Sequence, residues 1–199
     1  MRPVAEGFCL SQIEALPDLR CEVAVRLDRT VPDRDAFAHE VGGAPVITMT
    51  LPMAADFRND DEMAFVIGHE YGHHVARHIA KGERQALAGA LVLGLAVAYG
   101  QASADPYGTQ TAAQRRAVEG AFHLGAAVGE RAYSQAYELE ADTLGARIAA
   151  AAGYDPVRGA RFFARPEPVS APSGHRSFWG THPPDDVRVA TVMATARAD

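Results

Sequence analysis

Residues 61–80 read Asp-Glu-Met-Ala-Phe-Val-Ile-Gly-His-Glu-Tyr-Gly-His-His-Val-Ala-Arg-His-Ile-Ala, and this stretch decides how the rest of the chain is interpreted. Asn59 can cap a helix at its start, acidic residues fill the first turn, and apolar residues then recur at helical spacing. The pattern therefore predicts a helix over 61–80. Residues four apart share one face of a helix, so His69 and His73 present two imidazoles to one point, as zinc sites require.

The residues beside this pair indicate hydrolytic chemistry. Glu70 projects next to the two imidazoles, where it can take a proton from metal-bound water. A chance pair of histidines is the alternative, but the position of the pair inside an amphipathic helix favours the functional interpretation. The metzincin class is excluded, because its glycine and third histidine would fall at Ala76 and Ile79.

A hydrolytic zinc site needs three protein ligands and an open fourth position. The candidate third ligand is Glu138, 65 residues after His73 on a later predicted helix. Asp142 lies one helical turn further on the same face, where it can accept the spare N–H of a ligand histidine. Without the histidines, Glu138 and Asp142 would be interpreted as an exposed charged patch.

The residues before the histidine motif predict a small sheet over 22–51. Apolar residues alternate in 22–28, which is typical of a half-buried strand. Two further extended stretches, 36–40 and 45–51, flank the pair Gly42-Gly43, whose conformational freedom suits a tight hairpin turn. We therefore expect a small antiparallel sheet ahead of the helix.

Helical patterns fill most of the remaining chain. Residues 86–99 are its most apolar stretch, and these 14 residues fall short of the roughly 20 that cross a bilayer, so we expect a buried core helix or a re-entrant segment. Residues 101–111 have the composition of a loop. The region 112–152 is predicted to be helical and to carry the third ligand, and 184–196 to form a closing helix.

The composition is that of a compact globular protein. The chain has 199 residues, of which 48% are apolar and 22% charged, enough for one domain over 1–199 with its own core. A net charge of −6 leaves no broad basic field, so no nucleic-acid partner is expected. Together with the element pattern, this predicts an α+β fold that is mostly α.

Four segments of the chain resemble one protein family, and they occur in the family's order. They are Asp35-Ala36-Phe37-Ala38 with the glycine pair, residues 61–73, Ser134 with Glu138-Leu139-Glu140-Ala141-Asp142, and Ser177-Phe178-Trp179-Gly180-Thr181-His182-Pro183. On these motifs the chain is similar to the gluzincins of peptidase family M48, the family of the HtpX-like, BepA-like and CAAX-prenyl proteases. The resemblance implies a zincin-like metallopeptidase domain, of the compact soluble type, built on an active-site helix.

The resemblance also implies a role for each candidate residue. Glu70 would be the general base and then the proton donor, and Asp142 would support a ligand histidine. His182 would lie close to the metal, where it stabilises the oxyanion or occupies the open coordination position in a latent state. Arg188 would contact the transition state or the substrate. The implied ligands of the one zinc ion per chain are His69, His73 and Glu138.

The implied activity is endopeptidase cleavage of unfolded or misfolded polypeptides in protein quality control. An extended substrate would add as a strand to the sheet edge near 46–50, which favours unfolded chains of little sequence preference. Two alternatives stay open. One is a latent, chaperone-like zinc protein whose open position is blocked by His182 or by 101–111, and the other is a membrane-surface module that uses 86–99.

The expected compartment depends on the first residues and on the two cysteines. No apolar segment follows Met1-Arg2-Pro3, which favours a cytoplasmic protein. The family resemblance and a possible disulfide instead imply a bacterial periplasmic protein whose export signal has been removed, and this is the compartment that we expect. Cys9 and Cys21 would form a disulfide in an oxidising compartment or remain two buried thiols. The flanking membrane spans of HtpX-like proteins are missing, so membrane association would be peripheral or through an outer-membrane protein, and the oligomeric state is left open.

Overall fold

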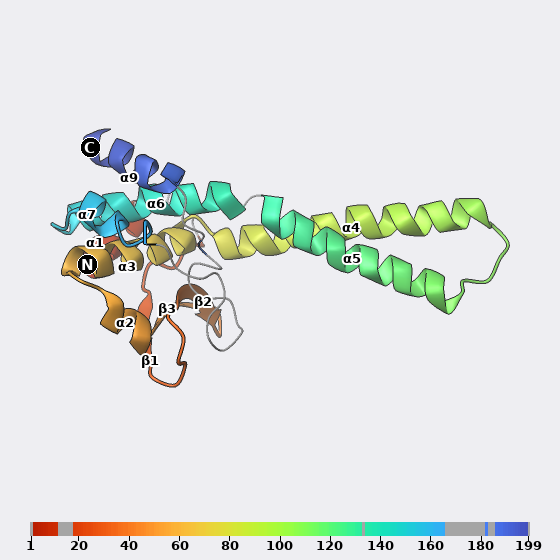
Figure 1. Cartoon of the computed structure of the whole chain (residues 1–199), viewed down its shortest axis with the longest axis horizontal. Helices are drawn as coiled ribbons and strands as arrows, with labels where there is room; N and C mark the ends of the chain where they lie inside the picture. The colour runs from red at the N-terminus through yellow and green to blue at the C-terminus, as the bar shows by residue number, and fades with distance from the viewer. Residues whose placement is uncertain (1, 12–17, 133, 166–181, 183–185, 199) are drawn as a thin grey trace. The chain divides into compact units, whose positions relative to one another are not determined.

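The computed structural model describes residues 2–11, 18–132, 134–165, 182 and 186–198 (Figure 1). The chain packs as two compact units, whereas the sequence predicts one domain over 1–199. The main unit comprises Met1–Arg77 and Glu138–Asp199. The second unit, His78–Tyr137, is here called the α-hairpin.

The main unit contains one small sheet and most of the helices, so the prediction of a mostly helical chain with a small sheet is confirmed. Its strands are β1 (Ala24–Asp28), β2 (Ala36–Val41) and β3 (Ala44–Thr50). Its helices are α1 (Arg2–Leu10), α2 (Leu51–Asp56), α3 (Asp60–Val75), α6 (Ser134–Ala151), α7 (Pro156–Ala160) and α9 (Asp186–Ala198), of which α6 begins in the α-hairpin.

The sheet is mixed rather than antiparallel throughout. β2 and β3 form the predicted hairpin, and the turn residues Gly42 and Gly43 have φ angles of 58° and 74°, which favour glycine. β1 pairs with the other side of β3 in parallel, with Ala24 opposite Val46. The antiparallel prediction is therefore wrong for β1, because alternating apolar residues indicate a strand without indicating its partner.

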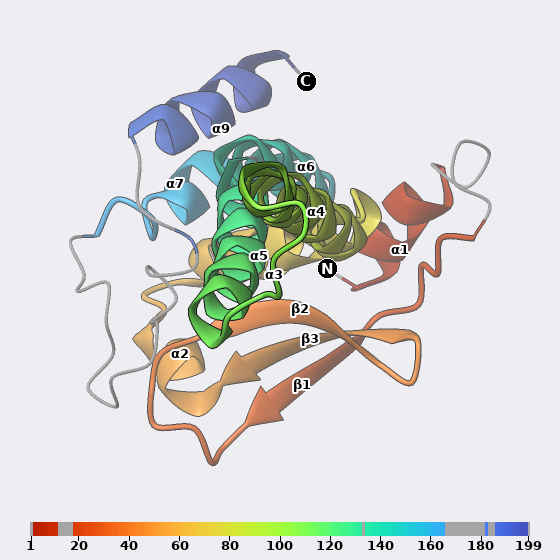
Figure 2. The same cartoon turned by 90° about the vertical axis from the view of Figure 1, so that its right-hand side faces the viewer.

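β3 is the central strand of the sheet (Figure 2). Residues 46–50 therefore have a neighbour on each side and offer no free edge, which corrects the expected docking position of a substrate strand. β1 and β2 are the edge strands. The half-buried character predicted for 22–28 holds at Val23, which is 2% exposed, but is wrong for β1, where Val25 and Leu27 are 49% and 45% exposed.

α3 begins and ends on local features of the chain. The side chain of Asn59 accepts a hydrogen bond from the Glu62 N–H and caps the helix, as the sequence predicts. The helix ends at Val75, and Arg77 then adopts a left-handed conformation with φ 55°, which turns the backbone out of the helix. The predicted helix 61–80 is therefore two helices, and its last residues begin the α-hairpin.

α6 lies directly against α3, because both helices carry glycine at their contact. A Cβ on Gly68 would lie 2.9 Å from the Gly145 carbonyl oxygen, and a Cβ on Gly145 would lie 2.7 Å from a backbone nitrogen of α3. At Gly72 a Cβ would lie 3.0 Å from the Ala141 carbonyl oxygen. Side chains at these positions would separate the helices, so the glycines hold α6 against the histidine-bearing turns of α3.

A disulfide joins Cys9 of α1 to Cys21, so the oxidised alternative is the one that the structure contains. Both cysteines belong to a buried apolar cluster that includes Tyr71 and Val75 of α3. The Tyr71 hydroxyl also donates a hydrogen bond to the Cys21 carbonyl oxygen. The disulfide therefore fixes α1 and the segment before β1 to the apolar side of α3.

The α-hairpin consists of α4 (His78–Ala104) and α5 (Ala112–Ala132), which lie side by side (Figure 1). The prediction that 86–99 is a buried core helix is wrong, because only His78 and Gly94 of α4 are buried. Leu87 and Val92, for example, are 62% and 73% exposed. With 27 residues and a mean hydropathy of 1.5, α4 is long and apolar enough to cross a membrane, alone among helices in the described part of the chain.

The other predicted helices form with shifted ends. The region 112–152 is divided into α5 and α6, and α6 ends before Gly153, whose φ of 86° favours glycine. The predicted loop 101–111 is shorter, because α4 continues to Ala104. α9 forms most of the predicted closing helix, and residues 184 and 185 lie outside the described chain.

Candidate metal centre

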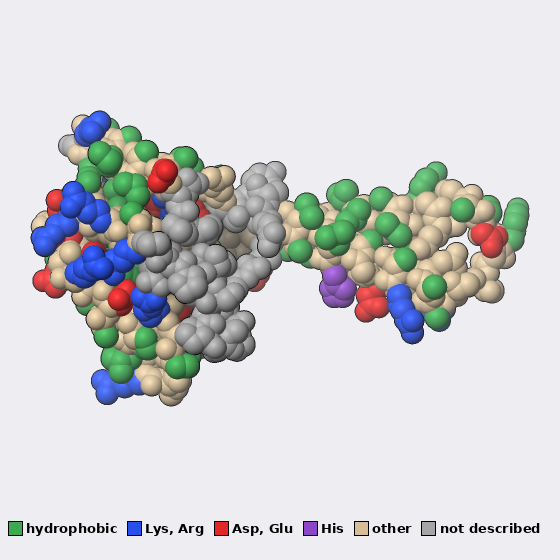
Figure 3. All heavy atoms as spheres, in the orientation of Figure 1, with side chains coloured by type: hydrophobic (Ala, Val, Ile, Leu, Met, Phe, Trp, Pro, Cys, Tyr) green, Lys and Arg blue, Asp and Glu red, His purple; other side chains and the backbone are tan. Residues whose placement is uncertain are grey.

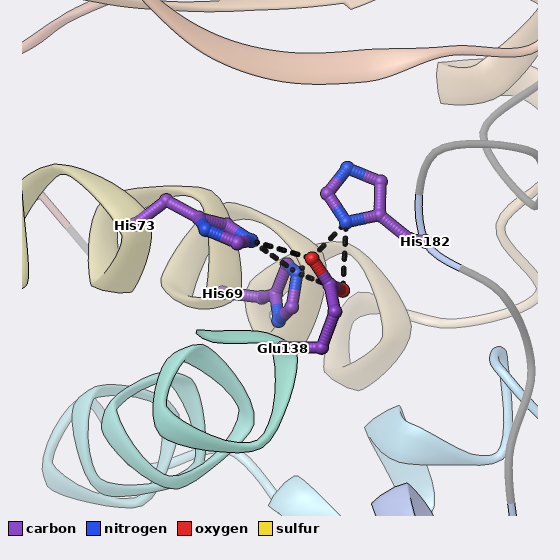
Figure 4. Close-up of side chains that lie close together, drawn as sticks. All are labelled: His69, His73, Glu138 and His182. Atoms are coloured by element: carbon purple, nitrogen blue, oxygen red, sulfur yellow. Dashed lines mark hydrogen bonds and ion pairs between the residues drawn. The ribbon is translucent and has the colours of Figure 1, made fainter. Parts of the chain in front are cut away.

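Four side chains that are distant in sequence meet beside α3 (Figure 4). His69 and His73 come from successive turns of α3, Glu138 from α6, and His182 from the segment before α9. One nitrogen or carboxylate oxygen of each side chain lies within 4.8 Å of the others. The structure thus brings together the three predicted ligands and His182, which the family resemblance places close to the metal.

The candidate ligand atoms face one another at short range. His73 Nε2 lies 3.0 Å from His69 Nε2 and 3.3 Å from Glu138 Oε1. Glu138 Oε2 lies 2.9 Å from His182 Nδ1. His69 is fully buried and His182 is 7% exposed, so bulk water has little access to these atoms. The distances fit a set of side chains that share one ion.

This donor set requires a positive charge between its members. His69 Nδ1 lies 2.9 Å from Asp142 Oδ1, which holds the proton on Nδ1 and leaves the Nε2 lone pair facing His73. Two imidazole lone pairs 3.0 Å apart repel each other unless a proton or a cation lies between them. A divalent metal meets this need, and zinc favours imidazole nitrogen together with carboxylate oxygen. The residues therefore fit a bound metal ion.

The pKa shifts in the centre reflect the same need for a positive charge between the donor atoms. Burial acts to lower the pKa of His69, but hydrogen bonds with Asp142 and Glu138 outweigh it and raise the pKa to about 9. Burial lowers the pKa of His73 to about 3, so its imidazole is neutral and its lone pair is available. Burial acts to raise the pKa of Glu138, but the charge and hydrogen bond of His182 lower it overall, so the carboxylate is ionised.

Glu70 lies beside the ligands on α3 and is held by a different contact. Its Oε2 accepts a hydrogen bond of 2.9 Å from the Ala38 N–H of β2. Its Oε1 is buried, has no hydrogen-bond partner among the described residues, and lies 3.5 Å from His182 Nε2. Burial raises the pKa of Glu70. One carboxylate oxygen is thus anchored, and the other lies beside His182 without a hydrogen bond to any described residue.

Arg188 of α9 holds two carboxylates of the centre. Its Nε and Nη2 donate hydrogen bonds of 2.7 Å to the two oxygens of Asp142, and its Nη1 lies 3.2 Å from Glu138 Oε2. Phe163 covers the guanidinium, whose carbon lies 4.0 Å from the ring centroid. Burial acts to raise the pKa of Asp142, but these hydrogen bonds lower it overall. The side chain is 2% exposed and faces the carboxylates rather than open solvent.

Sequence reasoning misses two groups of the centre. Ala38 belongs to a segment of the family resemblance, but the group that anchors Glu70 is its backbone N–H, so the side chain gives no sign of this role. Phe163 belongs to an apolar segment without a motif. The glycines of the α3–α6 contact, Gly68 and Gly145, have a visible signal, because each lies in a helical pattern where glycine is unfavourable.

Two histidines one helical turn apart, a carboxylate from a second helix and a glutamate beside them define the site of a metallopeptidase. The profile of Peptidase family M48 matches residues 12–196, and the chain belongs to this family. It is also similar to the mitochondrial metalloendopeptidase OMA1 of Arabidopsis thaliana, with 35% identity over 125 residues. That similarity covers 63% of this chain but 22% of the relative, so the chain spans about a fifth of the relative's length.

Proposed function

We propose that the protein is a zinc-dependent endopeptidase that cleaves unfolded or misfolded polypeptides in protein quality control. The observation that carries the proposal is the convergence of His69, His73 and Glu138 on one point, with Glu70 beside them. Membership of peptidase family M48 supports the class of reaction. These three side chains would hold one zinc ion, and Glu70 would serve as the general base.

The metal and the side chains would contribute different parts of the reaction. Zinc, when bound, would act as a Lewis acid on the scissile carbonyl and make water nucleophilic near neutral pH. Glu70 Oε1 accepts the proton of the attacking water, while Oε2 stays fixed by the Ala38 N–H. The same carboxyl group then gives the proton to the leaving amine. The anchored geometry keeps Glu70 in one orientation through both transfers.

Asp142 and Arg188 act through the ligands. Asp142 keeps the proton of His69 on Nδ1, and Arg188 holds Asp142 and Glu138 in place. We assign Arg188 this positioning role instead of the substrate contact that the family resemblance implies, because its side chain is 2% exposed. Losing support of this kind typically weakens metal affinity or activity about 10- to 100-fold.

The edge of β2 that faces away from β3, to which no described strand pairs, is the place where an extended substrate would pair. The Ala38 N–H donates to Glu70 rather than to β3, so this edge of β2 faces the general base. In an edge strand, the backbone N–H and C=O groups of every second residue point away from the sheet. These groups can form hydrogen bonds with the backbone of an added peptide strand. Pairing through the backbone depends little on side chains. This favours unfolded polypeptides as substrates.

Metal analysis and a cleavage assay together test the proposal. We expect purified protein to contain one zinc ion per chain and to cleave unfolded casein. A chelator should abolish cleavage, and added zinc should restore it, because the donor set otherwise lacks the cation that its lone pairs require. Full activity in metal-free protein would refute zinc dependence.

His182 supports a second, latent form of the same protein. Its Nδ1 lies 3.3 Å from His69 Nε2 and 2.9 Å from Glu138 Oε2, the same range as the contacts between the three proposed ligands. This imidazole would therefore fill the fourth coordination position that a hydrolytic site needs open. In that form the protein would keep its zinc without turnover, as the chaperone-like alternative requires.

The substitution His182→Ala distinguishes latency from catalysis. We expect kcat/KM for unfolded casein to rise about tenfold, equivalent to about 1.4 kcal/mol, because the fourth position is freed. Transfer of zinc to a competing chelator should also become faster. If His182 instead donates a hydrogen bond to the oxyanion, kcat should fall by about 10²- to 10³-fold and zinc release should be unchanged.

The Cys9–Cys21 disulfide supports a proposed location in an oxidising compartment such as the bacterial periplasm. In a reducing cytoplasm these thiols would not stay paired. The disulfide belongs to the same buried cluster as residues of α3. An oxidising location would therefore stabilise the proposed active-site helix.

A further inference from the structure

One face of α4 is apolar and exposed along most of the helix. Its large side chains are between 44% and 77% exposed. Figure 3 shows hydrophobic side chains following α4, whereas charged side chains gather on the side of α5. We call this surface the free face of α4, and its residues are Leu87, Ala88, Leu91, Val92, Leu95, Ala96 and Tyr99.

The opposite face of α4 packs on α5 mainly through glycines, with the Phe122 ring of α5 against Gly94. A Cβ on Gly89 would lie 2.1 Å from the Gly125 carbonyl oxygen, and one on Gly129 would lie 2.1 Å from the Gln85 carbonyl oxygen. The two backbones therefore touch. In water, a helix pair gains most by placing its large apolar side chains between the helices. Small residues inside and large apolar residues outside are typical of helix pairs in lipid.

Charge is absent from α4 over a long stretch and concentrated on one side of α5. Residues 85–104 contain no charged side chain, and at about 1.5 Å per residue they extend roughly 30 Å. α5 exposes a polar stripe formed by Arg115, Arg116, Glu119 and His123. The α-hairpin as a whole is therefore amphipathic.

We propose that the α-hairpin binds the surface of a lipid bilayer, with the free face of α4 in the acyl-chain boundary and the polar stripe of α5 in water. The hairpin lies in the plane of the membrane. Crossing would bring the charges of α5 into hydrocarbon, because the backbone contact at Gly89 and Gly125 keeps the two helices together. Burying one apolar face while charges stay solvated is the mode of interfacial helices.

The charge distribution favours a membrane over a second copy of the chain. The α-hairpin has five basic and four acidic residues, whereas the whole chain has 19 and 25. It is therefore the unit that an anionic lipid surface repels least. The free face also has no hydrogen-bonding side chain except the Tyr99 hydroxyl at its end, whereas protein interfaces usually carry hydrogen bonds across them.

Flotation with vesicles tests the proposal without any measurement of peptidase activity. The full chain is mixed with vesicles of phosphatidylcholine and phosphatidylglycerol and centrifuged through a density gradient. We expect the native protein to float. The double variant Leu91→Glu, Leu95→Glu should bind about 100-fold more weakly or worse, because two leucines of the free face no longer enter the apolar phase.

The matched control introduces two glutamates on α5, four residues apart as in the test variant. His123→Glu with Ala127→Glu adds charge at two exposed positions of that helix, and this variant should float like the native protein. Thermal unfolding followed by circular dichroism checks that both variants are folded. Equal flotation of the free-face variant, or failure of the native protein to float, would overturn the proposal. So would a dimer in lipid-free solution that the free-face variant converts to monomer.

A second measurement tests the in-plane orientation. Tyr107, in the loop between α4 and α5, is 99% exposed, and Tyr107→Cys would place a thiol there. An impermeant maleimide added outside vesicle-bound protein should label this cysteine as fast as it labels the protein in solution. Protection from the reagent would show that the loop crosses the bilayer and would overturn the in-plane arrangement.

Discussion

Replacing Glu70 with glutamine should reduce kcat/KM for unfolded casein by about 10³-fold, a loss of about 4 kcal/mol of transition-state stabilisation. The amide has the size of the carboxylate, and its oxygen can still accept the hydrogen bond from the Ala38 N–H, which is 2.9 Å long in the native protein. It cannot accept the proton of the attacking water. Zinc content should stay at one ion per chain, because Glu70 is not among the proposed ligands.

The Glu70→Gln variant should unfold at the same denaturant concentration as the native protein or a higher one. The substitution removes a buried charge, and burial already disfavours the ionised carboxylate. Glu140→Gln is the matched control, because it makes the same change at an exposed position of α6 and should keep the native rate. Native-rate cleavage by Glu70→Gln would exclude Glu70 as the general base.

Replacing Glu138 with alanine should weaken zinc binding by more than 100-fold and remove casein cleavage. The expected loss exceeds the roughly 10- to 100-fold typical of removing a group that only supports a ligand. The substitution removes the anionic oxygens that lie 3.3 Å from His73 Nε2 and 2.9 Å from His182 Nδ1. Competition with a chromogenic chelator measures the zinc affinity directly.

Glu138→Ala also leaves Arg188 with one carboxylate partner fewer, so part of its effect is on folding. Glu138→Gln keeps the volume and separates the two contributions, because it removes the negative charge without making a cavity. Glu140→Ala, two residues along α6, controls for the loss of a glutamate from this helix. Unchanged zinc stoichiometry in Glu138→Ala after dialysis would refute the third-ligand assignment.

The local features of the main unit could be predicted from the sequence because short-range interactions determine them. Asn59 and the acids after it specify the start of α3, and Gly42-Gly43 specify the turn between β2 and β3. The spacing of His69 and His73 places both imidazoles on one face of that helix. Each of these features involves residues within about one turn or one hairpin of each other.

The pairing of strands and the burial of helix faces depend on distant partners, and these features could not be predicted. The alternation in 22–28 indicates a strand, but its parallel pairing to β3 is decided by where the chain packs. The composition of 86–99 suggests burial, whereas the helix exposes its large apolar side chains and packs on α5 through glycine. Hydropathy reports how apolar a segment is and does not report which of its faces is covered.

By itself the sequence determined which side chains are candidates for the site: two histidines one turn apart with Glu70 between them, and a Glu138–Asp142 pair on one later helical face. These relations follow from the repeat of a single helix, which is the same in any fold. Tertiary structure alone decided that Arg188 supports the carboxylates and that Ala38 anchors Glu70. Such contacts join segments far apart in the chain, so they exist only once those segments pack together, as α3 and α6 do through their glycines.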